Sequence, residues 1–261
     1  MRIRRRLGPW LGESVLPAGS TRFIRSGVSR SVATRAAGQR LRVSPHNGRP
    51  DAAVVRASMV GSPPSMADIS RCLSVLEASR ISTCFTPALD WADAKAFLDC
   101  GFEIHENLLL MMANMIEAPP ATSHDISRAR RAHQGEVLEV DELAFSPFWR
   151  FDRYALREAR QATPASRYTV AMQRRVVGYA VTGQARGRGY LQRLAVHPNF
   201  QGQGVASSLV WDGFFWLWNK GVRQVYVNTQ IENHRAINLY ERLGFQREER
   251  GLVVLRWTSS P

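Results

Sequence analysis

The sequence predicts an α/β fold in two related parts, and three observations carry that prediction. Helical and strand-like hydrophobic patterns alternate from about residue 66 to the end of the chain. The helix–strand–helix–strand order of residues 66–112 returns 143 positions later, at 209–255, without a gap. A glycine-rich stretch, Leu191–Ala206 (LQRLAVHPNFQGQGVA), separates a predicted strand from a predicted helix in the second part.

The charge of the 261-residue chain is concentrated at its start. The formal net charge is +13, and residues 1–60 supply +10 of it, with twelve arginines against Glu13 and Asp51. The other 201 residues carry only +3, and the apolar content of the whole chain, 44%, is enough for a core. We expect residues 1–60 to be a basic disordered arm. A start codon set too far upstream and a transit peptide are the alternatives. The hypothesis that the protein is a nucleic-acid-binding module is supported by this basic arm alone.

The cysteines and the apolar runs restrict the class of protein. Cys72, Cys84 and Cys100 are odd in number and form no C-x-x-C pair, which disfavours a disulfide framework and a zinc site. No apolar run approaches the roughly 18–20 residues that a membrane span needs. We therefore expect a cytoplasmic protein with reduced thiols, no metal and no membrane segment.

Residues 61–116 form the first predicted block. Apolar residues recur at helical spacing over Asp68–Arg80, with Asp68 as the expected N-cap. A short strand at Ile81–Pro87, a helix at Asp90–Asp99 and a long strand at Glu103–Asn114 follow.

A linker at residues 117–125 separates the first block from residues 126–261, because Pro119 and Pro120 cannot donate hydrogen bonds to a sheet. The second block contains three successive antiparallel strands before the glycine-rich stretch, and so predicts a mixed, mostly antiparallel sheet flanked by helices. Its predicted helices are His133–Phe145, Asp152–Gln161, Val205–Lys220 and Asn233–Leu243. Its predicted strands are Arg167–Gln173, Arg175–Gly183, Gly189–Val196, Gln224–Thr229 and Gly251–Thr258.

The repeat pairs residues of one block with residues of the other. Both copies end their second helix at the same Gly-Phe dipeptide. Few residues are identical, so the evidence is mainly the shared order of elements, which predicts two related half-folds. The pairs are Arg80 with Arg223, Thr86 with Thr229, Gly101-Phe102 with Gly244-Phe245, and Leu109 with Leu252.

The glycine-rich stretch predicts an anion site. A strand ends, a loop turns, and a helix begins, so backbone N–H groups and the positive end of the helix dipole point at one spot. Gly202 and Gly204 let the backbone approach a phosphate closely because they lack a Cβ. A plain glycine-rich connection is the alternative.

Two motifs give residues 126–256 a resemblance to the GNAT-superfamily N-acetyltransferases. The segment Gln201-Gly202-Gln203-Gly204-Val205-Ala206 fits the superfamily loop Q/R-x-x-G-x-G/A and follows the strand Leu194-Ala195-Val196. The second signature, N-x-x-A-x-x-L-Y-x-x-L-G-F, is matched from Asn233 through Tyr240 to Phe245.

The resemblance implies a role for each motif residue. The loop amides of Gln201–Ala206 would bind the pyrophosphate of acetyl-CoA, and the backbone of Leu194, Ala195 and Val196 would bind the pantetheine arm and thioester. Asn233 would hold the pantetheine, and the two central strands would separate to admit it. Tyr240 would protonate the departing thiolate, since a phenol of pKa about 10 keeps its proton at neutral pH.

A general base is missing from the expected positions. The family often places a glutamate where this chain has Asn228, or near Tyr190 and Gln192. Glu232 and Asp152 stay open as alternatives. Freeing a lysine amine at pH 7 costs about 4–5 kcal/mol, against about 1 kcal/mol for an α-amine. A mechanism without a strong base therefore favours an α-amino or other weakly basic acceptor.

The first block lacks these features. Pro63 occupies the position paired with Ala206, Phe97 that of Tyr240, and Asp90 that of Asn233. Residues 61–116 thus resemble a degenerate partial GNAT copy, as in tandem members of the superfamily such as mycothiol synthase, although Asn228 argues against identity with that enzyme.

The sequence therefore predicts an acetyl-CoA-dependent N-acetyltransferase that transfers acetyl directly, in a ternary complex, to a primary amine of a small molecule or to a protein α-amine. An acetyl-CoA-binding pseudoenzyme with a regulatory role is the alternative. Expected partners are acetyl-CoA and the amine, with no nucleic acid and no membrane; homo-oligomerisation is left open.

Overall fold

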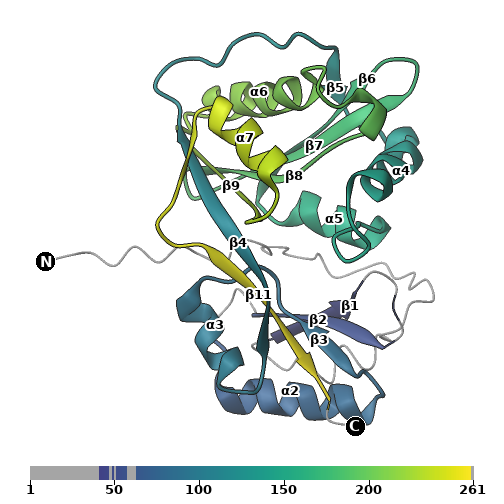
Figure 1. The fold of residues 1–261 in the computed structure, drawn as a ribbon, viewed down its shortest axis with the longest axis vertical. Coiled ribbons are helices and arrows are strands. Elements are labelled where there is room, and N and C mark those ends of the chain that lie inside the picture. Colours follow the sequence, from purple (N-terminus) through teal and green to yellow (C-terminus); the bar gives the residue numbers. More distant parts are fainter. Residues whose placement is uncertain (1–40, 47–48, 50, 58–62, 260–261) are drawn as a thin grey trace, which may run out of the picture. The chain divides into compact units, whose positions relative to one another are not determined.

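A computed structural model describes residues 41–46, 49, 51–57 and 63–259, and this part of the chain divides into two units (Figure 1). The first unit contains residues 41–109 together with 249–259, and the second contains residues 110–248. Each is described by itself.

The first unit has a five-stranded sheet in the order β1-β2-β3-β11-β4. Strands β1 and β2 form an antiparallel hairpin, and β3 joins β2 in parallel. The C-terminal strand β11 runs antiparallel to both β3 and β4. The bounds are Leu41–Pro45 for β1, Ala52–Ala57 for β2, Thr83–Phe85 for β3, Glu103–Asn114 for β4 and Leu252–Thr258 for β11.

Two helices, α2 (Met66–Ala78) and α3 (Trp91–Leu98), complete the first unit. Ser65 caps α2: its Oγ accepts from the Asp68 N–H, and the Asp68 carboxylate accepts from the Ser65 N–H. The prediction that Asp68 is the N-cap was therefore wrong by three positions, because this reciprocal capping box extends the helix backwards. Gly101 ends the connection after α3 with φ +85°, a conformation that glycine adopts without strain.

The predicted disordered arm was too long. Residues 41–45 and 52–57 are strands, and Leu41, Ala53 and Val55 lie in the core of the first unit with Leu76, Phe97 and Leu255. Both strands are short, with five and six residues, and lie in an arginine-rich region, so they give little signal in the sequence. Residues 1–40 lie outside the described residues.

The second unit has a sheet in the order β4-β9-β8-β7-β6-β5, and β10 (Phe245–Arg247) pairs with residues 111–113 of β4. Strands β5 to β8 are antiparallel, and β9 lies parallel to β8. The strand bounds are Ile126–Arg128 for β5, Ala165–Met172 for β6, Val176–Ala185 for β7, Arg188–Val196 for β8 and Gln224–Gln230 for β9. The helices are Arg131–His133 (η1), Gln134–Ala144 (α4), Arg153–Gln161 (α5), Pro198–Phe200 (η2), Val205–Trp218 (α6) and His234–Arg242 (α7).

Helices cover both faces of this sheet. Tyr179 and Val181 of β7 pack with Val137 and Val140 of α4 on one face. On the other face α6 lies so close that a Cβ on Gly213 would stand 2.4 Å from Thr182 Oγ1. The predicted α/β architecture, a mixed and mostly antiparallel sheet between helices, is thus confirmed. None of the described helices is long and apolar enough to span a membrane.

The units do not follow the predicted boundary at 116/126. Strand β4 gives residues 103–109 to the first unit and 110–114 to the second, and β11 returns to the first unit to pair with β3 and β4. The reason is non-local strand pairing, which a single sequence does not display.

Candidate functional site

The site begins where β8 and β9 stop pairing. A register shift between Val181 and Thr182 leaves Gln192 as the extra residue of β8, a β-bulge. The parallel pairing of β8 with β9 covers Arg188–Tyr190 against Gln224–Tyr226 and goes no further. Leu194, Ala195 and Val196 are paired with β7 along one edge only. On their other backbone edge, the Val196 carbonyl accepts from Gln201 Nε2, and β9 does not pair with it, which confirms the predicted separation of the two central strands.

The glycine-rich loop then turns into α6. Gly202 and Gly204 have φ values of +78° and +84°, and Gly204 is the N-cap residue without any side-chain cap. In the part of the chain that the structure describes, no acceptor takes the backbone N–H groups of residues 202–207. Several donors at the positive end of a 14-residue helix therefore remain available, the arrangement that binds phosphate.

The two glutamines of this loop hold it in place. Gln201 Nε2 donates to the Val196 carbonyl at 2.9 Å, and Gln203 Nε2 donates to the Asn199 carbonyl at 3.0 Å. Arg235 of α7 donates to Gln201 Oε1, and the Gln201 backbone N–H is used by Pro198 O. The backbone N–H of Gln201 is therefore not available for the predicted contact with pyrophosphate. The N–H groups of Gly202, Gln203, Gly204, Val205 and Ala206 are available.

The segment expected to be a linker also lies at this loop. Ser208 Oγ, in the first turns of α6, is 3.1 Å from Ser123 Oγ and 3.0 Å from His124 Nδ1. A Cβ on Gly204 would stand 3.4 Å from His124 Cε1. Sequence reasoning missed Ser123 and His124, since nothing local connects residues 122–124 with a loop some 80 positions later.

Helix α7 presents the two remaining motif residues. Asn233 caps the helix by accepting the Ala236 N–H through Oδ1 at 3.2 Å, which leaves its Nδ2 free to donate. Tyr240 is only 6% exposed and packs against Phe245, and no described residue hydrogen-bonds its hydroxyl. Burial raises the pKa of Tyr240 above its ordinary value, while the charge of Arg193 acts in the opposite direction. The phenol therefore keeps its proton at neutral pH.

The carboxylates near these residues are occupied or exposed. Asp152 Oδ1 caps α5 by accepting the Ala155 N–H at 2.8 Å. Glu232 is largely exposed, 3.7 Å from His234. Asn228 is half-buried on β9 and offers no carboxylate. Among the described residues, no group of three His, Cys, Asp or Glu side chains is placed to hold a metal ion.

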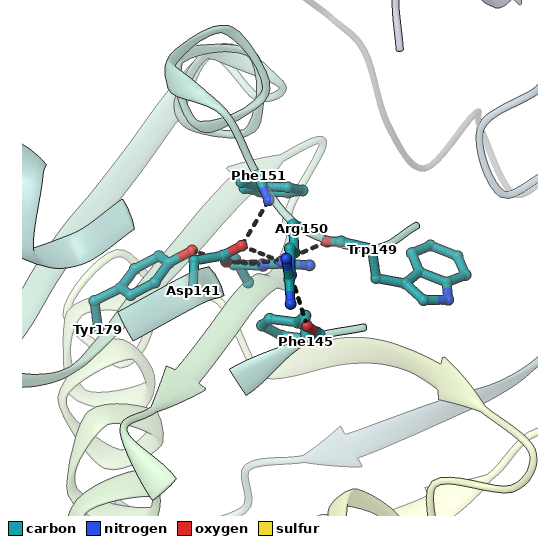
Figure 2. Close-up of polar contacts among 7 residues, drawn as sticks. Asp141, Phe145, Trp149, Arg150, Phe151 and Tyr179 are labelled. Atoms are coloured by element: carbon teal, nitrogen blue, oxygen red, sulfur yellow. Dashed lines mark hydrogen bonds and ion pairs between the residues drawn. The ribbon is translucent and has the colours of Figure 1, made fainter. Parts of the chain in front are cut away.

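A buried ion pair joins Arg193, near the end of β8, to Asp141 of α4. Asp141 of α4 is fully buried and accepts two hydrogen bonds from Arg193, each of 2.8 Å, and one from the Tyr179 hydroxyl. Figure 2 shows Asp141 beside Tyr179 and close to the aromatic residues Phe145 and Phe151. Neither Asp141 nor Arg193 was singled out in the sequence, although an aspartate on the apolar face of α4, next to Val137 and Val140, is a signal.

A family model matches most of the second unit. Residues 135–245 match the family described as "Acetyltransferase (GNAT) family". This span includes β8, the glycine-rich loop, α6, β9 and α7, which carry the geometry above.

Curated relatives share a shorter segment. N-alpha-acetyltransferase 30 of Schizosaccharomyces pombe is 36% identical over 63 residues, which are 24% of this chain and 42% of the relative. The protein of the same name from Saccharomyces cerevisiae is 37% identical over 63 residues, 24% of this chain and 36% of the relative. The match thus spans less than half the length of either relative.

Solved structures share the fold over most of the chain. A tandem GNAT protein from the clavulanic acid biosynthesis pathway aligns with a TM-score of 0.62 at 14% identity, covering 85% of this chain and 79% of that one. A GCN5-related N-acetyltransferase from Sphaerobacter thermophilus aligns with a TM-score of 0.54 at 16% identity, covering 85% and 76%.

Proposed function

Because residues 135–245 match the acetyltransferase (GNAT) family, we propose that this chain is an acetyl-CoA-dependent N-acetyltransferase whose second unit carries the reaction. The observation that supports this most is the unbonded N–H groups of residues 202–207 next to the unpaired edge of β8. A cytoplasmic location stays a prediction, and so does the identity of the amine.

The donor site follows from this geometry. The N–H groups of residues 202–207 suit the pyrophosphate of acetyl-CoA, since they meet at the positive end of α6. The backbone edge of Leu194–Val196 suits the amides of the pantetheine arm, and Asn233 Nδ2 is a free donor for the same arm. Gln201 acts by holding the loop against Val196.

The chemistry is direct transfer from the thioester to the amine. Acetyl-CoA supplies the acetyl group as a thioester, and Tyr240 holds a proton at its hydroxyl for the departing thiolate. An acyl-enzyme route would need a nucleophile such as a cysteine. The three cysteines, Cys72, Cys84 and Cys100, all belong to the first unit, and burial raises the pKa of the Cys72 thiol to about 12. These facts support a ternary complex.

The acceptor we propose is a weakly basic primary amine, above all an α-amine of a peptide or protein. Asn228 replaces the expected carboxylate, and Asp141 is saturated by its own donors, so neither position offers a base to deprotonate a lysine. An α-amine needs about 3–4 kcal/mol less than a lysine to lose its proton at pH 7. The similarity to proteins named N-alpha-acetyltransferase 30 supports the same class.

A thiol-release assay tests this function. The wild type and Tyr240→Phe are each given acetyl-CoA with three acceptors: peptides with a free α-amine, the same peptides α-blocked but containing lysine, and small amines. We expect release with free α-amines, at least tenfold slower release with lysine alone, and loss of most activity in Tyr240→Phe. Equal rates on the two peptide sets would refute the α-amine assignment. Acetyl-CoA binding without release on any acceptor would favour a regulatory pseudoenzyme.

A further inference from the structure

The ion pair between Asp141 and Arg193 also contacts the segment that joins α4 to α5, residues 145–152. Arg193 Nη2 donates to the Trp149 carbonyl at 2.7 Å, and the Phe151 N–H donates to Asp141 Oδ1 at 2.6 Å. The guanidinium lies 3.5 Å from the ring centre of Phe145 and 3.7 Å from that of Phe151. One buried cation thus contacts the segment at three places.

These contacts tie the segment to the sheet and to α4. The segment also has bonds of its own: the Phe145 N–H donates to Asp141 O, the Trp149 N–H donates to Ser146 O, and Arg150 Nε donates to the Phe145 carbonyl at 3.2 Å. Figure 2 shows the Phe145 and Phe151 rings on two sides of the polar groups at Asp141, whereas Trp149 reaches them with its backbone carbonyl. Burying two charges is costly and rarely the best way to stabilise a core, whereas directional bonds fix a geometry.

The segment lies at the reacting end of the proposed donor site. Arg193 directly precedes Leu194–Val196 on β8, and its charge acts on the Tyr240 hydroxyl. The side chain of Ala195 packs among Val137 and Val140 of α4, on the sheet face opposite to α6. The donor phosphate is expected at the N-terminus of α6, so the face of α4 and α5 is the one left for the second substrate.

We propose that Asp141 and Arg193 are positioning residues for the amine acceptor, which they serve by holding residues 145–152 as a wall of the acceptor site. This inference rests on the proposed function. Neither side chain is a catalytic base or acid, because all four bonds to the Asp141 oxygens are intramolecular and come from Phe151, Tyr179 and Arg193. Trp149 and Phe148 are half-buried side chains of the segment and are candidates for direct contact with the acceptor.

The first test replaces the whole polar network by apolar side chains of similar size, in the variant Asp141→Leu/Tyr179→Phe/Arg193→Met. Such replacements of buried ion pairs are often neutral or stabilising. The matched control is Arg167→Met/Asp212→Leu, which removes another two-bond pair of the same unit, with lengths of 2.6 and 2.7 Å, away from residues 145–152.

Three measurements distinguish a positioning role of the network from a general effect on stability. We expect the network variant to bind acetyl-CoA within twofold of the wild type by calorimetry, and to lose at least tenfold in kcat/KM for the amine. Hydrogen exchange at the amides of residues 145–152 should be at least tenfold faster, while exchange in α6 stays unchanged. The control should show neither change. An unaltered kcat/KM with unaltered exchange at 145–152 would overturn the proposal.

A second variant covers the case in which the network variant does not fold. Arg193→Lys keeps the positive charge near Tyr240 but cannot donate to Asp141 and Trp149 in the same fork or stack between two rings. We expect faster exchange at 145–152 and at least a fivefold lower kcat/KM for the amine, with acetyl-CoA affinity retained. Wild-type rates and exchange in this variant would contradict the proposal.

The two proposals fail in different ways. If the wild type releases no thiol with any amine, the proposed function fails, and exchange at residues 145–152 still decides whether the network holds the segment. If the wild type is active and the network variant is equally active, the proposed enzymatic function is retained and the positioning role of Asp141 and Arg193 is refuted.

Discussion

Helices α2 and α6 overlap under the predicted 143-residue repeat, and their N-termini differ in what occupies them. In the first unit Ser65 and Asp68 close the start of α2 by a reciprocal capping box, and Pro63 and Pro64 just before it have no N–H to offer. In the second unit α6 starts at Gly204 with no side-chain cap. The same order of elements therefore occurs with a capped helix start in one unit and with an uncapped start, the proposed anion site, in the other.

The strands before and after these helices differ less than the helix starts do. Strands β2 and β3 pair over three positions, up to Val54 and Phe85, and β8 and β9 pair over three positions, up to Tyr190 and Tyr226. Under the 143-residue shift Phe85 corresponds to Asn228, so the pairing ends two positions later in the first unit. A fold alone does not make a site; in the second unit, unbonded N–H donors accompany the unpaired strand edge.

The largest difference is expected between Tyr240 and Phe97, which occupy equivalent positions on α7 and α3. Tyr240→Phe removes the proton donor and should lower kcat by about a hundredfold, within the usual range for a general acid. Acetyl-CoA affinity should stay within twofold. Phe97→Tyr buries a hydroxyl at a position that is 1% exposed, and should lower stability without creating a second active site. Thiol release and thermal unfolding measure these effects, and full activity in Tyr240→Phe would refute the acid role.

Gly204 and Gly101 have nearly equal φ values, +84° and +85°, so alanine strains both by about 1–2 kcal/mol. Only Gly204→Ala should also weaken acetyl-CoA binding, by about tenfold, because relief of the strain turns the N–H groups of the loop away. Denaturant unfolding and calorimetry on both variants make the comparison. Equal affinities in the two would contradict the assignment of the donor site.

Asn233 and Asp90 cap the equivalent helices α7 and α3 through one side-chain oxygen each. Alanine at either position should cost about 1 kcal/mol of unfolding free energy. Asn233→Ala should additionally weaken acetyl-CoA binding severalfold, since the free Nδ2 donor is lost. If Asp90→Ala weakened binding as much, the loss would reflect stability and not a contact.

The smallest expected effect is that of alkaline pH on Tyr240. Its pKa is raised by burial, so the neutral, donating form persists above the ordinary value of about 10. With a peptide α-amine at saturation, kcat should rise as the amine loses its proton near pH 8 and then stay level to pH 9.5. A fall in kcat between pH 8.5 and 9.5 would contradict the environment described for Tyr240.

Local signals explain what the sequence predicted well. Strand β4 has the predicted bounds, Glu103–Asn114, and the glycines at 101 and 244 both follow helices and have positive φ values. Asn233 caps its helix, and Tyr240 faces inward from it. Each of these depends on a few neighbouring residues, and that is the range at which patterns and caps act.

Tertiary contacts explain what the sequence missed. The return of β11 to the first unit depends on partners about 145–175 positions earlier in the chain. The bond of His124 to Ser208 and the ion pair of Asp141 with Arg193 likewise join distant segments. Strands β1 and β2 are short and lie in an arginine-rich region, and the Gln201 N–H that was predicted to bind pyrophosphate is bonded to the Pro198 carbonyl.

Calorimetry with acetyl-CoA tests the central claim, that only the second unit binds the donor. We expect one acetyl-CoA per wild-type chain and no binding to Gly204→Pro, because proline has no N–H and its φ near −65° is incompatible with +84°. Pro64→Gly, at the closed helix of the first unit, should bind like the wild type. Two sites per chain, or undiminished binding in a folded Gly204→Pro, would contradict the account.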